Sequence, residues 1–246
     1  MHTRASLAAD LARLGVVPGD TLFVHSSFKS LGPVDGAAGA MVGALEDALG
    51  PEGLLLMPSF NLLPKGGEAR AQNWNRSSTP SSVGWLTEFF RTLPGTVRSD
   101  HYSHSVAARG KDAALFVGDH PSLEGMETPW DRAPWGRTYG TQSPMIKAYR
   151  RPNGKVLMLG VDYHSSTYCH VVETFFWAWK KTARHDFPFN YINRVAVGEY
   201  WDSLQRQARG KVGDADCRLF GIRDFVDTMV AAVKPDPKRF FKWYEE

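Results

Sequence analysis

The sequence lacks the long apolar runs of a membrane protein. Its longest runs, residues 53–58 and 155–161, are far shorter than the roughly 20 residues that a membrane-spanning helix requires. The start of the chain also lacks the apolar core of a secretory signal, because Asp10 and Arg13 interrupt it. We therefore expect a cytoplasmic protein that does not use a membrane as a partner.

Cysteine is scarce, and neither sign of charge is in large excess. Cys169 and Cys217 could pair only if the fold happened to bring them together, so we expect two free thiols. The net charge of +3 is small for 246 residues. A modest basic group at residues 234–242 is interpreted as a solvated helix end, so we expect no nucleic-acid partner.

What is present is an ordinary globular composition, with 43% hydrophobic and 22% charged residues. The chain has no repeat, no low-complexity segment and no break in composition. A chain of this length can bury a sizeable core. These features predict one domain over residues 1–246.

Apolar spacing predicts helices that alternate with strands. Helices are expected at residues 6–15, 36–49, 83–92, 111–117, 167–181 and 222–233, and strands at 21–25, 53–58, 155–161 and 189–200. Residues 61–82 are expected to form a long loop, and residues 124–144 a second irregular stretch. A strand, a helix and a further strand in this order build parallel sheets, so the pattern predicts an α/β fold.

The sharpest chemical pattern lies at the start of the predicted helix after the strand at residues 155–161. Thr167, His170 and Glu173 are spaced three apart, so they lie on one side of that helix. In α/β enzymes, ligands usually bind where strands end and helices begin. An imidazole there can accept a proton near neutral pH, and a carboxylate beside it would orient the ring. Taken alone, such a pair is more often a structural hydrogen bond.

Two further concentrations of polar residues have weaker spacing. His101 and His104, with His164, His170 and Glu173, could supply zinc ligands, but no named metal motif is present, so we expect no metal. The loop at residues 26–32 offers hydroxyls, backbone N–H groups and Lys29 to a phosphate-bearing ligand, although it is no P-loop. A plain hydrogen-bonded turn is the alternative interpretation of that loop.

A series of segments, in chain order, resembles the signatures of the aminoglycoside 3-N-acetyltransferases. The segments are residues 10–15, 19–27, 31–32, 79–91, 94–95, 98–101, 105–110, 143–144, 157–161 and 167–173. The resemblance implies a three-layer α/β/α sandwich with a mostly parallel central sheet. It also implies acetyl-CoA as co-substrate, direct transfer of the acetyl group to a small-molecule amine, and no metal.

Carried over by position, the resemblance also implies site residues. His170 would be the catalytic base, Glu173 its supporting carboxylate and His101 a second catalytic residue. The cofactor-binding residues would be Ser26, Ser27, Phe28, Lys29, Ser30, Leu31, Gly32, Ser103, Ser105 and Ser143. The substrate-binding residues would be Asp162, His164, Thr167 and Trp130.

The chain departs from the family pattern near the expected acceptor. His164 stands where the family commonly has Asp, and Tyr102 where it usually has Pro. A site for a polycation should be rich in carboxylates, and those expected nearby are few: Asp100, Glu124, Glu127 and Asp131. The resemblance implies transfer to an amine of an aminoglycoside or a related aminated natural product. The departures slightly favour a smaller or less cationic amine over a true aminoglycoside. A metal-dependent hydrolase and a non-catalytic acyl-CoA-binding protein are the alternatives, and a homodimer is compatible with the sequence without being required.

Overall fold

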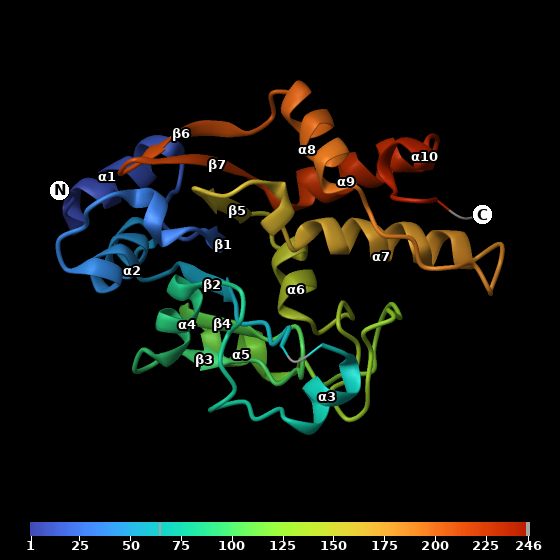
Figure 1. Ribbon diagram of the computed structural model, residues 1–246. Coiled ribbons are helices and arrows are strands. Elements are labelled where there is room, and N and C mark those ends of the chain that lie inside the picture. The colour runs from blue at the N-terminus through green and yellow to red at the C-terminus, as the bar shows by residue number, and fades with distance from the viewer. Residues whose placement is uncertain (64, 245–246) are drawn as a thin grey trace.

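A computed structural model describes residues 1–63 and 65–244. The fold is built on a seven-stranded sheet whose strands lie in the order β3-β4-β2-β1-β5-β7-β6 (Figure 1). The strands are β1 (Thr21–Ser26), β2 (Leu54–Pro58), β3 (Val97–Arg98), β4 (Val106–Gly110), β5 (Gly154–Leu159), β6 (Ala208–Val212) and β7 (Ala215–Gly221). The three strands that the sequence predicted before residue 189 form the centre of the sheet. The flanking strands were not predicted.

The sheet is mixed, with a parallel centre. β1 pairs in parallel with β2 and β5, whereas β2–β4, β3–β4, β5–β7 and β6–β7 are antiparallel. The expectation of a mostly parallel sheet is therefore correct only for the three central strands. Apolar patterning does not reveal β6 because all of its residues except Val212 are exposed. The turn between β6 and β7 is only two residues long, which forces an antiparallel pair.

Alternating side chains on the central strands build two apolar cores. Leu22 and Val24 of β1 face one core, and Phe23 faces the other, because successive side chains of a strand point to opposite faces. One face of the sheet is covered by α1 (Arg4–Leu14), α2 (Ala37–Leu49) and α4 (Trp85–Thr92). The other is covered by α5 (Ala113–Gly118), α6 (Pro144–Arg150), α7 (Tyr168–Lys181), α8 (Arg194–Ser203) and α9 (Ile222–Val233). The predicted three-layer α/β/α arrangement is confirmed.

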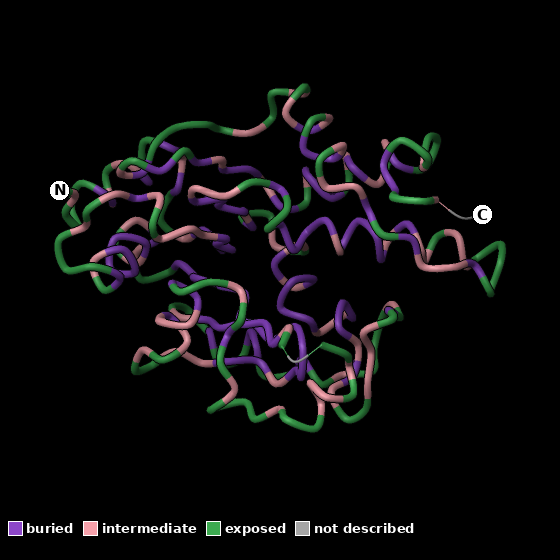
Figure 2. The backbone as a smooth tube through the Cα atoms, in the orientation of Figure 1, coloured by how far each residue is buried: buried purple, intermediate pink, exposed green. Residues whose placement is uncertain are grey.

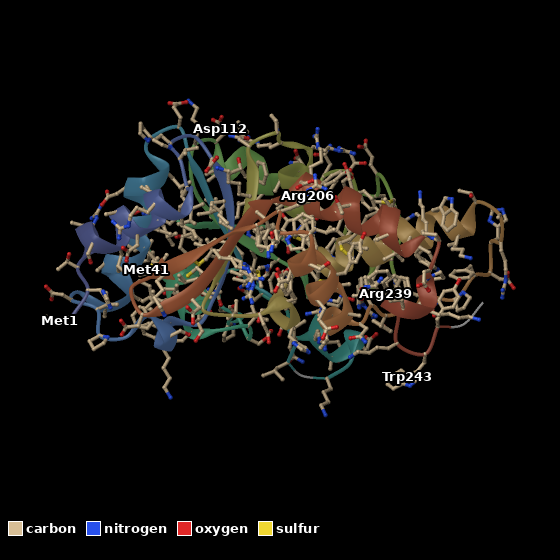
Figure 3. All side chains as sticks on the ribbon, turned by 90° about the horizontal axis from the view of Figure 1, so that it is seen from above. Met1, Met41, Asp112, Arg206, Arg239 and Trp243 are labelled. Atoms are coloured by element: carbon tan, nitrogen blue, oxygen red, sulfur yellow. The ribbon has the colours of Figure 1, made fainter. Side chains whose placement is uncertain are left out.

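Four short elements complete the described chain. They are α3 (Gly67–Gln72), α10 (Pro237–Phe240) and the 3-10 turns η1 (Phe28–Leu31) and η2 (Tyr163–Ser165). α3 interrupts the long loop expected at residues 61–82. Figure 3 shows the labelled Met1 and Trp243 at opposite ends of the molecule. Among the described residues, no helix is long and apolar enough to cross a membrane.

The strand predicted at residues 189–200 is wrong, because a helix begins within it. Asn193 caps α8, and its side-chain oxygen accepts hydrogen bonds from the N–H groups of Val195 and Ala196. Val197 and Trp201, four residues apart, are the buried residues that fasten the helix to the core. Valine and the aromatic residues of this segment suggest a strand by composition, but the cap and the helical spacing decide its conformation.

The parallel centre brings three strand ends to one edge of the sheet. β1 ends at Ser26, β2 at Pro58 and β5 at Leu159, and η2 and α7 follow directly after β5 (Figure 1). The central strands and the first half of α7 run mostly through the buried interior (Figure 2). In sheets of this kind ligands bind outside the carboxyl ends of the parallel strands. The edge at Ser26 is therefore where a site is expected.

Gly198 sets how closely α8 packs against η2. A Cβ atom at this position would lie 2.4 Å from Cδ2 of Tyr163, a distance that real structures do not show. We expect Gly198→Ala to lower the free energy of unfolding by about 1–3 kcal/mol, measured by urea denaturation, because the buried ring has to shift. The matched control is Gly39→Ala in α2, where nothing lies within 4 Å of the new Cβ; we expect it to gain about 0.5–1 kcal/mol. Equal stabilities of the two variants would contradict this account.

Candidate active site

A cavity of about 300 Å³ lies at the carboxyl ends of the parallel strands. Its walls come from the ends of β1 and β2, the loop after β2, η2 and the first turns of α7 and α8. The lining residues include His25, Ser26, Phe60, Thr167, His170 and Arg194. The structure thus brings to one cavity the start of the 26–32 loop and the 167–173 pattern, as the sequence predicted, and adds α8.

His170 and Glu173 form a close pair on α7. Nδ1 of His170 lies 2.6 Å from Oε2 of Glu173. Oε1 of Glu173 accepts a hydrogen bond of 2.8 Å from the backbone N–H of Ile192, and its side chain is only 2% exposed. Both oxygens of the buried carboxylate are therefore engaged. One of them holds the imidazole in a single orientation.

Arg194 and Glu173 together set which nitrogen of His170 carries the proton. Nη2 of Arg194 lies 2.6 Å from Nε2 of His170, and a guanidinium can only donate hydrogen bonds. Nε2 therefore accepts this hydrogen bond. Nδ1 carries the proton and donates a hydrogen bond to Glu173. The imidazole has its lone pair on the nitrogen that faces the cavity, as a general base requires. The sequence did not single out Arg194, because residues 189–200 were assigned to a strand.

His25 joins the end of β1 to the start of α7. Its Nε2 accepts a hydrogen bond of 3.2 Å from the backbone N–H of Thr167. Burial, together with the positive charge of Arg194, lowers the pKa of His25 to about 3, so the ring is neutral near pH 7. The bond places the first turn of α7, and with it His170, against the strand end. Sequence reasoning overlooked His25, although it directly precedes the 26–32 loop.

Trp130 packs directly against the catalytic candidate. Its ring lies 5.0 Å from the His170 ring and 5.1 Å from that of Phe189, in edge-to-face geometry in both cases. The rings of His104, Tyr139 and Tyr191 are further neighbours of Trp130. The structure therefore places Trp130, predicted as a substrate-binding residue, within contact of His170.

The members of the 26–32 loop have different environments. Ser26 lines the cavity, and its Oγ is buried and has no hydrogen-bond partner among the described residues. Phe28 packs against Trp85, and the Lys29 side chain is exposed. Ser30 donates to the carbonyl of Gly160, and Leu31 is fully buried in the core. The hydroxyl of Ser30 and the side chain of Leu31 are therefore occupied by the fold rather than turned to a ligand.

Three serines predicted to bind the cofactor lie away from the described lining of the cavity. Ser105 donates a hydrogen bond of 2.5 Å to the carbonyl of Ser59 and accepts one from Arg98. Ser103 bonds to the ring of His104 at 2.8 Å, and Ser143 is buried at the start of α6. The hydroxyls of Ser103 and Ser105 are used inside the protein, and that of Ser143 makes a contact of 3.9 Å with Sδ of Met145. For these three residues the geometry gives the predicted role no support.

His101 belongs to a stack of buried rings rather than to the cavity wall. Its ring lies 4.7 Å from that of His120, Nδ1 accepts from the backbone N–H of His104 at 3.0 Å, and Nε2 bonds to Oγ1 of Thr138 at 3.2 Å. Both ring nitrogens are thus occupied. Burial lowers the pKa of His101 well below its ordinary value. His104 stands between this stack and His170, with its ring 6.3 Å from the His170 ring.

Of the remaining predicted residues, His164 lines the cavity, and Asp162 stands two residues before it. Asp162 caps η2 through a hydrogen bond of 3.0 Å from the backbone N–H of His164, and both side chains are mostly exposed. Thr167 is buried and lines the cavity. Among the described residues, no three His, Cys, Asp or Glu side chains are grouped so as to hold a metal ion.

Comparison with known proteins identifies the family. The family model described as "Aminoglycoside 3-N-acetyltransferase" matches residues 23–234, which include the cavity and both of its helices. The chain belongs to the aminoglycoside 3-N-acetyltransferase family. The resemblance found in the sequence is thereby confirmed, and with it the assignment of the protein as an acyltransferase.

Relatives in this acetyltransferase family cover nearly the whole chain. The aminoglycoside N(3')-acetyltransferase-like protein YokD of Bacillus subtilis is 31% identical, over 92% of this chain and 90% of its own length. Aminoglycoside N(3)-acetyltransferase IV of Salmonella is 30% identical, over 96% and 89%. Among solved structures, the AAC-IIIb complex with CoASH superposes with a TM-score of 0.75 at 25% identity over 99% of each chain. A histidine-to-alanine variant of AAC(3)-IVa in complex with a gentamicin gives 0.76 at 25%, over 97% and 91%.

Changing the Glu173 carboxylate to an amide should reverse the tautomer of His170. In Glu173→Gln the amide oxygen can still accept from the backbone N–H of Ile192, and the NH2 group then faces Nδ1. Because NH2 is a donor, Nδ1 has to accept, which favours a proton on Nε2 instead. We expect turnover to fall by about 10² or more, because the lone pair no longer faces the cavity. Steady-state acetylation rates measure the effect. A Glu173→Gln variant that is folded and as active as the wild type would refute the tautomer assignment.

Proposed function

We propose that this protein is an acetyl-CoA-dependent N-acetyltransferase that acetylates an amine of an aminoglycoside or a related aminated natural product, with His170 as general base. The observation that supports it most is the cavity-lining His170, whose Nδ1 is held by the buried Glu173, so that Nε2, which accepts from Arg194, carries the lone pair that a base needs. The two free cysteines are in keeping with action in the cytoplasm, where the co-substrate would be available.

The chemistry requires a base at this position. An alkylammonium ion is not a nucleophile, so a proton must leave the nitrogen before it attacks the thioester carbonyl. That first proton leaves to solvent; His170 Nε2 then accepts a second proton from the attacking nitrogen, the new C–N bond forms and the C–S bond breaks. The proton then passes from the imidazolium to the CoA sulfur, which leaves an amide and free CoA thiol. Such proton transfer contributes about 10²–10⁴ to a rate.

The negative charge on the tetrahedral intermediate needs hydrogen-bond donors. The unpartnered hydroxyl of Ser26, at the end of β1, supports a place for this oxyanion beside the cavity. Backbone N–H groups of the 26–32 loop are further donors of the required kind. The solved complex of a relative with CoASH supports acetyl-CoA as the co-substrate, and the complex of another relative with a gentamicin supports an amine acceptor.

Release of thiol from acetyl-CoA tests the proposal. The assay follows a thiol reagent with a panel of aminoglycosides and simpler amines, with and without EDTA. We expect turnover that depends on the amine and does not change with EDTA. Thiol release that EDTA abolishes would instead favour a metal-dependent hydrolase, and CoA binding without turnover of any amine would favour a non-catalytic binding protein.

A further inference from the structure

Arg194 occupies the position that the acceptor amine has to reach. Its Nη2 lies 2.6 Å from Nε2 of His170, and a base must lie within about 2.6–3.2 Å of the group whose proton it removes. The amine nitrogen and Nη2 cannot share that place, so the guanidinium has to move aside before His170 can act. Arg194 therefore lies beside the place that an incoming acceptor amine has to take.

The backbone that carries Arg194 is held firmly. Ile192, two residues earlier, donates its N–H to Glu173, and the side chain of Asn193 caps the helix that Arg194 begins. Nη1 of the guanidinium donates to the carbonyl of His164. Only the side chain therefore has to swing for the amine to enter.

The charge of Arg194 is not balanced by an ion pair within residues 1–63 and 65–244. Its hydrogen-bond partners are a neutral ring nitrogen and a carbonyl oxygen. Glu173, on the far side of the imidazole, already accepts two hydrogen bonds. No carboxylate is found among the described residues that line the cavity. An acceptor therefore meets a positive charge beside the base.

Three of the four carboxylates that the sequence suggested for a cationic acceptor are engaged elsewhere. Asp131 accepts from the backbone N–H groups of Thr128 and Thr138. Glu127 forms ion pairs with Arg137 and Lys181. Asp100 accepts from the indole N–H of Trp74, and Glu124 is exposed. These interactions leave the acceptor side poorly suited to a polycation.

We propose that Arg194 recognises the acceptor and narrows the acceptor class proposed above: the preferred acceptors are aminated compounds that carry an oxyanion, a carboxylate or a phosphate, a few bonds from the nitrogen, rather than polycationic aminoglycosides. The proposal rests on the acetyl transfer proposed above. A guanidinium binds an oxyanion through two parallel hydrogen bonds, which draws Arg194 away from Nε2 and leaves the lone pair to the neighbouring amine. A second ammonium group on the acceptor would add like charge instead.

Matched acceptors and two variants test this role. The kcat/KM is measured with 3-aminopropanoate, O-phosphoethanolamine and 1,3-diaminopropane for the wild type, Arg194→Gln and Arg194→Glu. In the wild type we expect at least a tenfold preference for one or both acids over the diamine, and the two acids show whether carboxylate or phosphate fits better. Arg194→Gln should reduce that preference at least tenfold, mainly through the KM for the acid. Arg194→Glu should reverse it in favour of the diamine.

Arg206→Gln is the matched control, because Arg206 lies on the surface, where it pairs with Asp224 (Figure 3). Thermal unfolding checks that each variant is folded, and we expect the control to keep the wild-type preference. Failure of every amine in the functional panel would overturn the acetyl transfer itself. An enzyme that acetylates other amines but prefers the diamine, uses neither acid, or keeps its preference in both Arg194 variants would overturn only the role of Arg194.

Discussion

Replacement of His170 by alanine should lower the turnover of acetyl transfer by about 10² or more while the affinity for acetyl-CoA stays within a few-fold. The reason is geometric, because Nε2 carries the lone pair of the imidazole, and the contacts with Glu173 and Arg194 fix the orientation of the ring. In the variant the attacking amine would have to lose its proton to water. Single-turnover rates and a CoA-binding titration separate the two effects.

An exposed histidine provides the control for this experiment. His185 lies on the surface beyond α7, so His185→Ala should keep the wild-type turnover. Thermal unfolding of His170→Ala shows whether the loss of one partner of the buried Glu173 alters the fold. A folded His170→Ala enzyme with wild-type turnover would end the proposed mechanism, whatever its affinity for acetyl-CoA.

A fall in pH from 7 to 5 should remove much of the stability of the fold. Four histidines are buried and neutral: burial lowers the pKa of His25 to about 3 and of His120 to about 4, and lowers those of His101 and His104 well below the ordinary value. In the unfolded chain each of these histidines has a pKa near 6.5. The contribution of these neutral histidines to the free energy of unfolding is therefore fully present above about pH 6.5. It is lost as the pH falls toward the pKa values that the histidines have in the folded protein.

The size of the effect follows from the difference in proton binding. Each buried histidine lowers the free energy of unfolding by about 2 kcal/mol between pH 7 and pH 5, and the four together lower it by roughly 8 kcal/mol. That sum is comparable with the total stability of a domain, about 5–15 kcal/mol. Urea denaturation at the two pH values measures it, and we expect a much lower midpoint at pH 5.

A substitution within the stack tests the assignment. His120 bonds to Oγ of Ser99 and to the carbonyl of Thr138, contacts that an asparagine can partly keep. His120→Asn should therefore reduce the loss of stability between pH 7 and pH 5 by about 2 kcal/mol, because one titrating group is gone. An equal stability of the wild type at both pH values would show that these rings are not buried as neutral groups.

The central part of the site could be predicted from local spacing. His170 and Glu173 are three residues apart in a helix, and such neighbours meet wherever the helix forms. The central strands were also predictable, because runs such as Leu54–Pro58 are apolar on both faces. The placement of Ser26 beside them follows from parallel strands ending at one edge.

The partners of His170 that lie far along the chain could not be predicted in this way. Arg194 reaches it across 24 residues, and the backbone N–H of Thr167 reaches His25 across 142. No spacing rule links residues at such separations. The misassigned strand at residues 189–200 also hid the helix that presents Arg194.

The sequence alone determined the α/β class, the family resemblance and the pairing of His170 with Glu173, since these depend on apolar periodicity, ordered motifs and contacts within one helix. Tertiary structure decided which nitrogen of His170 carries the proton and which charge stands beside it. It also decided that Ser103, Ser105 and His101 are used inside the protein, whereas Ser26 lines the cavity. The physical reason is that hydrogen-bond partners and burial depend on packing between distant segments, and local sequence does not specify that packing.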